Sequence, residues 1–337
     1  MRPYRLFAAA FMWGRMLLLA SLAHGTAQAQ RIDPEVQTLR AMLQKSDVEI
    51  DLARAKLTID RMIDPSIDIE SNLQKLDAMA SAVRISAGAN PTSLRTASML
   101  RSYLYDAGNW NNKQPFQYDL TDPLGQKVSN KLLPTYLATK KGNCVSMPTL
   151  FVLLAQKLGL DATFAEAPGH VFVKYRDETG RSYNLETTSG GNERADESYQ
   201  RDTPMTPQAL KHGIYMRGFS KKEAIVTVLM DPLIEHHKQQ GNAERIIALS
   251  DLALEYYPKN ADAMLNKGYA YFLILKRDFL SKYPSPRGIP AEDRPRFDEL
   301  SRNNNAWYAR AEELGWRQPD AGADARYMRT IKNVRPN

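Results

Sequence analysis

Cysteine is nearly absent from this sequence, since Cys144 is the only one among 337 residues. A single cysteine excludes an internal disulfide, so the Cys144 thiol is free for other chemistry. Histidine and acidic residues form no cluster with metal-ligand spacing, and no glycine-rich loop follows a predicted strand. We therefore expect no bound metal and no other cofactor.

A strong excess of one charge is also missing. The formal net charge is +7, and three of the arginines lie close to the N-terminus, at Arg2, Arg5 and Arg15. Without them the net charge falls to about +4, which is an ordinary surface bias. An excess of this size is not the electrostatic footprint of nucleic-acid binding, and we predict no nucleic-acid partner.

Residues 1–29 have the pattern of a secretory signal peptide. Positive charge at Arg2 and Arg5 precedes an apolar stretch around residues 16–20, and the Ala-Gln-Ala at residues 27–29 fits a small-x-small cleavage site. The apolar stretch is too short and too interrupted for a transmembrane helix. We expect cleavage after Ala29 and a periplasmic or secreted protein with no stable membrane span.

The remaining chain divides by composition and periodicity into four parts. Apolar residues at helical spacing predict a helical N-terminal subdomain over residues 30–106. A loop rich in glycine, asparagine and proline then opens a core over residues 107–230. Helical periodicity returns over residues 231–317, where the pattern resembles tetratricopeptide repeats, and we expect a loose tail over residues 318–337.

Within the core, one apolar helix precedes a short run of strands. The helix is predicted over residues 145–158, and because it is apolar nearly all round we expect it to be buried. Strand patterns follow at residues 162–165, 171–175 and 182–187, with a turn between the last two. The predicted fold class is α+β, with a cysteine-bearing helix packed on a small antiparallel sheet between helical N- and C-terminal regions.

Three residues around these elements have the chemistry of a nucleophile, a base and an orienting acid. Cys144 lies at the start of the apolar helix, where free amides and the helix dipole stabilise a thiolate. His170 begins one strand, and Glu186 ends the next, so antiparallel pairing can bring them together. Asn184 shares a strand face with Glu186 and is an alternative partner for the imidazole.

Such a constellation supports nucleophilic catalysis. His170 would activate the Cys144 thiol and later protonate a leaving amine, while the third group fixes the tautomer of the imidazole. The backbone amide of Cys144 is the natural donor to an oxyanion, and the Asn143 side chain or the loop at residues 110–112 could add a second donor.

These motifs together resemble a known family. The runs Gly-Asn-Cys-Val-Ser at 142–146, Pro-Gly-His at 168–170 and Tyr-Asn-Leu-Glu-Thr at 183–187 resemble the transglutaminase-like superfamily. Residues 72–77 and 108–112 also resemble segments of its SirB-like branch, called the transglutaminase-like core. The resemblance implies a papain-like fold with a catalytic Cys-His-acid triad.

Carried over by position, the resemblance makes Cys144 the nucleophile, His170 the base and Glu186 the acid, although an aspartate is more usual at the third position. Members of the SirB-like branch often carry C-terminal tetratricopeptide-like repeats, and some relatives lack the cysteine.

Two functions follow from the sequence. The first is a thiol enzyme that transfers or hydrolyses an acyl group at a carboxamide or peptide bond of a protein or peptide, for which an envelope peptide is a plausible source. The alternative is a non-catalytic scaffold in the cell envelope whose repeat region binds a protein.

Overall fold

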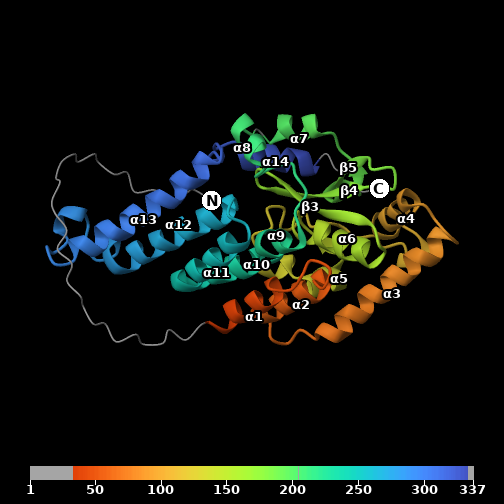
Figure 1. Ribbon diagram of the computed structural model, residues 1–337, viewed down its shortest axis with the longest axis horizontal. Helices are drawn as coiled ribbons and strands as arrows, with labels where there is room; N and C mark the ends of the chain where they lie inside the picture. Colours follow the sequence, from red (N-terminus) through yellow and green to blue (C-terminus); the bar gives the residue numbers. More distant parts are fainter. Residues whose placement is uncertain (1–32, 204, 333–337) are drawn as a thin grey trace.

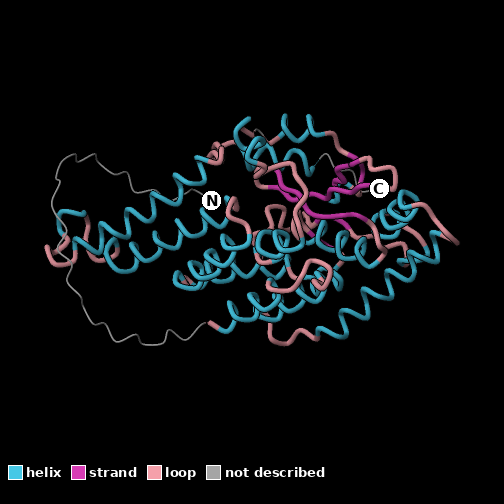
Figure 2. The backbone as a smooth tube through the Cα atoms, viewed as in Figure 1, coloured by secondary structure: helices cyan, strands magenta, loops and turns pink. Residues whose placement is uncertain are grey.

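The structure is a computed structural model that describes residues 33–203 and 205–332. The expected signal peptide, residues 1–29, lies outside the described residues. Within the described ranges, no helix is both long enough and apolar enough to cross a membrane. The chain is rich in helix, and its strands gather in one region (Figure 2).

A four-stranded antiparallel sheet forms the centre of that region, with the strands in chain order β3-β4-β5-β6 (Figure 1). A separate parallel pair, β1 with β2, lies in the chain before it. The strands are β1 (Gln117–Tyr118), β2 (Lys141–Gly142), β3 (Asp161–Ala167), β4 (His170–Arg176), β5 (Ser182–Glu186) and β6 (Asn192–Glu193).

The β3–β4 hairpin closes through a two-residue turn. Ala167 pairs with His170, which leaves Pro168 and Gly169 in the turn. Gly169 has φ of +69°, a left-handed conformation that glycine adopts at no steric cost. On the other side of β4, Lys174 pairs with Asn184. Because side chains alternate along a strand, this register places His170 and the last residue of β5 on the same sheet face.

Helix α6 (Ser146–Lys157) is the buried helix of this region and lies close to the predicted 145–158. All residues from Ser146 to Ala155 are buried. The helix packs against β3 and β4 on one side, and against helices α3 (Ile69–Ala87) and α4 (Ser93–Tyr105) on the other. A helix without a polar face suits this position because protein surrounds it.

The N-terminal helices are closed by side-chain caps and tied to the core by one buried ion pair. Asp51, Asp68 and Thr92 each accept a backbone N–H at the start of a helix. Lys56 and Asp60, both fully buried, form an ion pair of 2.6 Å on one helix. Their helix is α2 (Leu52–Ile63), which follows α1 (Pro34–Leu43).

The C-terminal region is helical, as the periodicity predicts. Successive helices α11, α12 and α13 pack side by side and form the extended part of the molecule (Figure 1). Helix α13 has Pro295 in its first turn, where the missing N–H of proline breaks no hydrogen bond within the helix. The helices are α10 (Asp231–Gln240), α11 (Ala243–Tyr256), α12 (Ala261–Leu275) and α13 (Arg294–Glu313).

The tail differs from the expectation of a loose segment over residues 318–337. It contains helix α14 (Ala323–Lys332), which lies near the sheet rather than beside α13 (Figure 1). Tyr327 anchors it, because its hydroxyl bonds to the Tyr118 hydroxyl at 3.0 Å. The segment is thus held by a contact with a residue far away in the sequence, which no local sequence pattern predicts.

Candidate functional site

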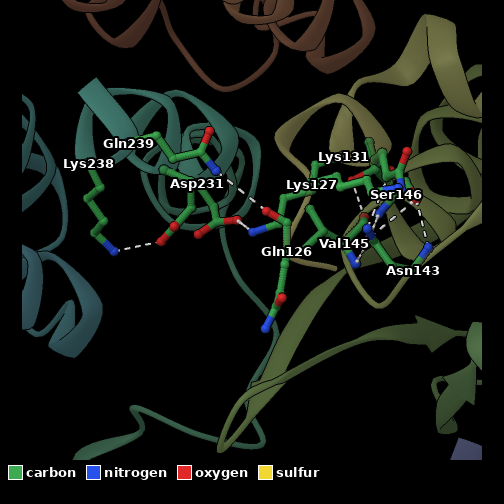
Figure 3. A network of polar contacts seen from close by, with 12 residues as sticks. Gln126, Lys127, Lys131, Asn143, Val145, Ser146, Asp231, Lys238 and Gln239 are labelled. Carbon is green, nitrogen blue, oxygen red and sulfur yellow. Dashed lines mark hydrogen bonds and ion pairs between the residues drawn. The ribbon is translucent and has the colours of Figure 1, made fainter. Parts of the chain in front are cut away.

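Cys144 sits in a tight turn immediately before α6, and Asn143 builds that turn. The Asn143 Oδ1 accepts the backbone N–H groups of Val145 at 2.9 Å and Ser146 at 3.0 Å (Figure 3). Its amide nitrogen donates to the carbonyl of Asn130 at 3.4 Å. Asn143 thus acts as a cap, and its side-chain donor is already engaged. The backbone N–H of Cys144 has no partner in the part of the chain that the structure describes.

His170 and Glu186 form the second part of the site. The His170 Nε2 lies 2.7 Å from the Glu186 Oε2, and both side chains are buried. Glu186 also accepts the Tyr199 hydroxyl at 2.8 Å and the Thr188 hydroxyl at 2.5 Å. The Thr188 backbone N–H also donates to it at 3.1 Å. Four donors therefore hold the carboxylate in place, and the carboxylate in turn orients the imidazole.

Asn184, the alternative partner for the imidazole, lies elsewhere on the sheet face. Its side-chain oxygen accepts the Lys174 ammonium at 2.7 Å. Its amide nitrogen donates to the carbonyl of Arg194 at 3.0 Å and to Asp196 at 2.5 Å. The structure thus brings Glu186, and not Asn184, to His170.

The thiol lies on the wall of the same cavity as the imidazole. Since Nε2 of His170 bonds to Glu186, Nδ1 is the ring nitrogen left for the thiol, and it is buried and forms no hydrogen bond with any described residue. The charges of Cys144 and His170 act on each other and shift both pKa values. His170 therefore bonds to Glu186 and acts on Cys144 through its charge.

The charges around Cys144 and His170 favour the thiolate of the first and the imidazolium of the second. Burial alone would raise the pKa of the Cys144 thiol, but His170, Tyr327 and Lys131 outweigh it and lower that pKa. Burial alone would lower the pKa of His170, but Glu186 and Cys144 raise it to about 10. For Glu186, burial is likewise outweighed, by His170 and hydroxyl donors, and its pKa falls to about 2. The arrangement stabilises a thiolate beside an imidazolium.

Two tyrosines, Tyr118 and Tyr327, lie beside the site. The Tyr327 hydroxyl interacts with Cys144 and with the Tyr118 hydroxyl. The Tyr327 ring lies 5.9 Å from the imidazole of His170, centroid to centroid. Helix α14 thus contributes directly to the site, although Tyr327 follows His170 by 157 residues in the sequence.

Lys131 adds a smaller positive charge that also lowers the pKa of the Cys144 thiol. It lies on the 3-10 turn η2 (Val128–Lys131), and its ammonium donates to Asp231 on α10 at 2.9 Å (Figure 3). The same turn carries Asn130, whose carbonyl accepts the Asn143 amide. Lys131 therefore links the cysteine turn to the C-terminal helices.

The thiol opens into a cavity of about 530 Å³. Cys144, His170 and Lys131 line it at the sheet side, and residues of α10 and α12 line the opposite side. Cys144 is partly exposed, and the imidazole reaches the same space. A reagent or substrate therefore has room beside the sulfur.

Other sequence candidates lie away from this cavity. In the loop at residues 110–112, the Asn111 amide donates to the Asp106 carbonyl at 2.8 Å, so it closes its own loop. That loop is not part of the cavity wall. Among the described residues, no group of three or more histidine, cysteine or acidic side chains is placed to hold a metal ion.

The arrangement defines a class of site, in which a thiol before a helix meets an imidazole and a carboxylate on an adjoining hairpin. Comparison with known proteins agrees at the level of the superfamily. Residues 70–203 match a family model described as the transglutaminase-like superfamily, and the chain carries such a domain there. No curated protein and no solved structure matched the chain. The matched range begins within α3, ahead of the core boundary expected at residue 107.

Sequence patterns did not identify three contributors to the site. Tyr199 lies on the short helix α7 (Asp196–Asp202), Lys131 on a 3-10 turn and Tyr327 on α14. None belongs to a motif, and none is near Cys144 in the sequence.

Proposed function

We propose that this protein is a transglutaminase-like thiol enzyme that transfers or hydrolyses an acyl group at a carboxamide or peptide bond. The observation that carries the proposal is the bonded pair of His170 and Glu186 on the wall of the cavity that the Cys144 thiol also lines. The lowered pKa of the thiol and the raised pKa of the imidazole support it, since the thiolate is the nucleophilic form of cysteine.

In the proposed reaction, the Cys144 thiolate attacks the carbonyl carbon, and the carbonyl electron pair moves to oxygen. The unpaired N–H of Cys144 is placed to stabilise the oxyanion. Collapse of the intermediate expels the amine, which takes its proton from the His170 imidazolium and leaves a thioester. The neutral imidazole then removes a proton from water or an incoming amine, which attacks the thioester and restores the thiolate.

The roles of the other side chains follow from their contacts. Glu186 keeps Nε2 of His170 protonated, so that Nδ1 faces the sulfur. Tyr199 and Thr188 hold Glu186, and they are positioning residues in this scheme. Lys131 supports the thiolate by its charge.

The finer assignments also belong to this proposal. The SirB-like branch is supported by the sequence runs around the site and by the helical C-terminal region. Residues 1–29 support export to the periplasm or the medium, where a protein or peptide of the cell envelope would be the substrate. N-terminal sequencing of the exported protein tests this, and the expected mature chain begins at Gln30.

Thiol reactivity tests the proposed chemistry. Alkylation of the folded protein by iodoacetamide should have its midpoint below the ordinary thiol pKa of about 8.5. His170→Ala should move the midpoint upward, and each unit of pKa lowers the thiolate fraction at pH 6 about tenfold. His212→Ala is the control, because that ring bonds to the Leu314 carbonyl outside the site. A profile unchanged in His170→Ala would reject the enzyme.

A non-catalytic scaffold is the second candidate, and the tyrosine beside the thiol favours it. Tyr327 occupies the hydrogen-bonding position beside Cys144, as it would in a site that no longer turns over. The packed helices α11 to α13 would then carry a partner protein, as the tetratricopeptide-like pattern suggests. Labelling of wild type, but not of Cys144→Ala, by a substrate-like acylating probe would decide against the scaffold.

A further inference from the structure

A further charged group reaches the Glu186 carboxylate, the guanidinium of Arg194. Its Nη1 lies 3.7 Å from the Glu186 Oε2, the oxygen that also bonds to His170. The Arg194 side chain is only 19% exposed, and Glu186 is buried. The contact is too long for a hydrogen bond, but a charge with so little access to solvent is weakly screened. Arg194 therefore acts on the carboxylate through its charge.

Three contacts fix the guanidinium in this place. Arg194 follows β6, and its backbone N–H donates to the Asn184 carbonyl at 2.9 Å. The guanidinium carbon lies 4.4 Å from the centre of the Tyr199 ring, whose hydroxyl donates to Glu186. Its Nη2 donates to Asp202 on α7 at 2.5 Å. Stacking and paired hydrogen bonds are the contacts that hold an arginine in one geometry.

Asp202 does not cancel the charge of Arg194. Its second oxygen accepts the Nε of Arg201 at 3.1 Å, so this partly exposed carboxylate is shared between two guanidiniums. One positive charge is left in excess, and Arg194 is the member of the group that reaches Glu186. Tyr199 is affected by this charge, because burial and Glu186 raise the pKa of its hydroxyl while Arg194 opposes them.

The other ionisable groups around Glu186 do not supply such a charge. Burial, and to a smaller extent Glu186 itself, raises the pKa of the Tyr105 and Tyr118 hydroxyls, so both stay neutral near pH 7. Arg101 on α4 is paired with Asp106 at 3.2 Å. Within the described residues, none of these four side chains forms an ion pair or a hydrogen bond with the carboxylate.

The need for a second cation arises between the two halves of the proposed reaction. In the free enzyme, the His170 imidazolium holds Glu186 in its ionised form against burial. Once the imidazolium has given its proton to the leaving amine, the ring is neutral and Cys144 is a neutral thioester. Glu186 is then a buried carboxylate without its main counter-charge, and burial favours its protonated form. Arg194 is the cation that stays within ion-pair distance.

A proton taken up at this stage would stop the second half of the reaction. The neutral imidazole must remove a proton from water while the water oxygen attacks the thioester carbon, after which the carbon–sulfur bond breaks and returns the thiolate. An extra proton on the His170–Glu186 pair removes either the base or the carboxylate that orients it. The positive charge of Arg194 disfavours that proton, whichever of the two groups would bind it.

We infer that Arg194 is a positioning residue that keeps the His170–Glu186 pair free of an extra proton in the acyl-enzyme, so that the imidazole can act as the base. The inference rests on the proposed function for its place in the reaction. The effect of Arg194 on the pair, however, exists in the resting protein and can be measured without turnover.

Titration of His170 in the Cys144→Ala protein tests this effect without catalysis. The pH dependence of the NMR signals of the ring gives its pKa. Arg194→Met removes the charge and keeps much of the apolar stem, so it should raise the pKa of His170 by about one unit, a tenfold gain in proton affinity. Arg194→Lys restores the charge and should reverse most of the change. A pKa equal in Arg194→Met and its parent would overturn the inference.

Two neighbouring substitutions complete the titration. Asp202→Asn removes the acid that shares Arg194, so the pKa of His170 should fall. Arg201→Met removes an exposed cation from the same acid and should leave the titration unchanged. A loosened fold cannot explain opposite changes in Arg194→Met and Asp202→Asn. If Arg194→Met does not fold, a pKa unmoved in Asp202→Asn would count against the inference instead.

Turnover of p-nitrophenyl acetate then places Arg194 in the reaction. The initial burst of nitrophenol reports acylation of Cys144, and the steady rate reports deacylation. In Arg194→Met the burst should stay close to that of wild type, while deacylation should fall about tenfold on the acid side of its pH profile, because the profile moves to higher pH by about one unit. Arg194→Lys should move it back. Equal losses in both steps at every pH would show a structural role and contradict the inference.

The two readouts separate the inference from the proposed function. A wild type without a burst rejects the proposed enzyme, and the titration alone then decides whether Arg194 acts on the His170–Glu186 pair. A burst followed by an unshifted deacylation profile in Arg194→Met rejects the inference and leaves the enzyme in place.

Discussion

Glu186 has more contacts than its role as a partner of histidine requires. Its two oxygens accept donors from His170, Tyr199 and Thr188. In the Glu186→Gln variant the carboxylate charge is lost while the shape remains. The pKa of His170 should fall toward its ordinary value, and kcat should fall by about 10²-fold or more, the scale of general acid–base catalysis. A pH–rate profile measures both effects.

Glu186→Gln should also change how the unfolding free energy depends on pH. Because the pKa of His170 is raised in the folded state, its charge stabilises the fold fully below pH 6.5, and this stabilisation is lost as the pH rises toward about 10. Because the pKa of Glu186 is lowered, its charge stabilises the fold fully above pH 4.5, and this stabilisation is lost as the pH falls toward about 2. The difference in unfolding free energy between wild type and Glu186→Gln should be greatest between pH 4.5 and 6.5. Asn184→Ala should not show this window.

At the scale of the element, the turn between β3 and β4 positions His170. Gly169 has φ of +69°, and a Cβ added there would meet no atom within 4 Å. Gly169→Ala should therefore cost only the backbone strain, about 1–2 kcal/mol. Because the turn sets the position of His170, activity should fall more than stability.

A matched control exists at the end of α6. Gly159 has φ of +76° and equally open surroundings, so alanine causes the same strain far from the hairpin turn. Gly159→Ala should lower the melting temperature by a similar amount and leave kcat nearly unchanged. Equal losses of kcat in the two variants would show that the turn has no special influence on the imidazole.

Helix α14 should have two separable effects on the thiol. Tyr327 lowers the pKa of Cys144 through a hydrogen bond, so Tyr327→Phe should raise the midpoint of alkylation. Removal of residues 319–337 should also increase the limiting alkylation rate at high pH, because Tyr327 and its helix no longer lie beside the thiol. Arg329→Ala changes an exposed residue of the same helix and is the control. A limiting rate unchanged by the truncation would mean that α14 does not restrict access.

Local sequence was a good guide to elements whose structure depends on near neighbours. The apolar run at 145–158 and the strand patterns at 171–175 and 182–187 correspond closely to α6, β4 and β5. By contrast, α14 depends on a hydroxyl contact with Tyr118, 209 residues away. Composition suggested a loose tail, because no local pattern records a contact of that separation.

In the candidate site, too, some residues were predictable from the local sequence and others were not. Cys144, His170 and Glu186 could be selected from residue type and strand order. Tyr199 and Lys131 could not, because tertiary packing brings them to the site from a short helix and a turn without sequence signals. The choice between Glu186 and Asn184 also required the register, which alternation alone leaves open by two residues.

At the scale of the whole molecule, a buried ion pair joins the N-terminal helices to the core. Besides its bond to Asp60, Lys56 donates to the Lys131 carbonyl at 3.0 Å, and Asp60 accepts the Leu133 amide at 2.8 Å. Lys56→Met leaves a buried carboxylate without its cation, which should cost about 3–5 kcal/mol. Urea unfolding measures the loss.

An exposed pair between α2 and α3 provides the comparison. Arg54 and Glu70 are 2.6 Å apart, but both side chains are at least half exposed. Arg54→Met should cost no more than about 1 kcal/mol. Because Lys131 also supports the thiolate, Lys56→Met should disturb alkylation of Cys144 in protein that is still folded, while Arg54→Met should not.

The solitary thiol has a consequence for oxidation. A partly exposed cysteine with a lowered pKa is the kind that peroxide converts to a sulfenic acid. In proteins with a second cysteine nearby, the sulfenic acid condenses with that thiol to a disulfide, which protects it from further oxidation. This sequence has no second cysteine. The oxidised form of Cys144 can therefore be rescued only by a thiol from another molecule, and without one the next oxidation step is irreversible.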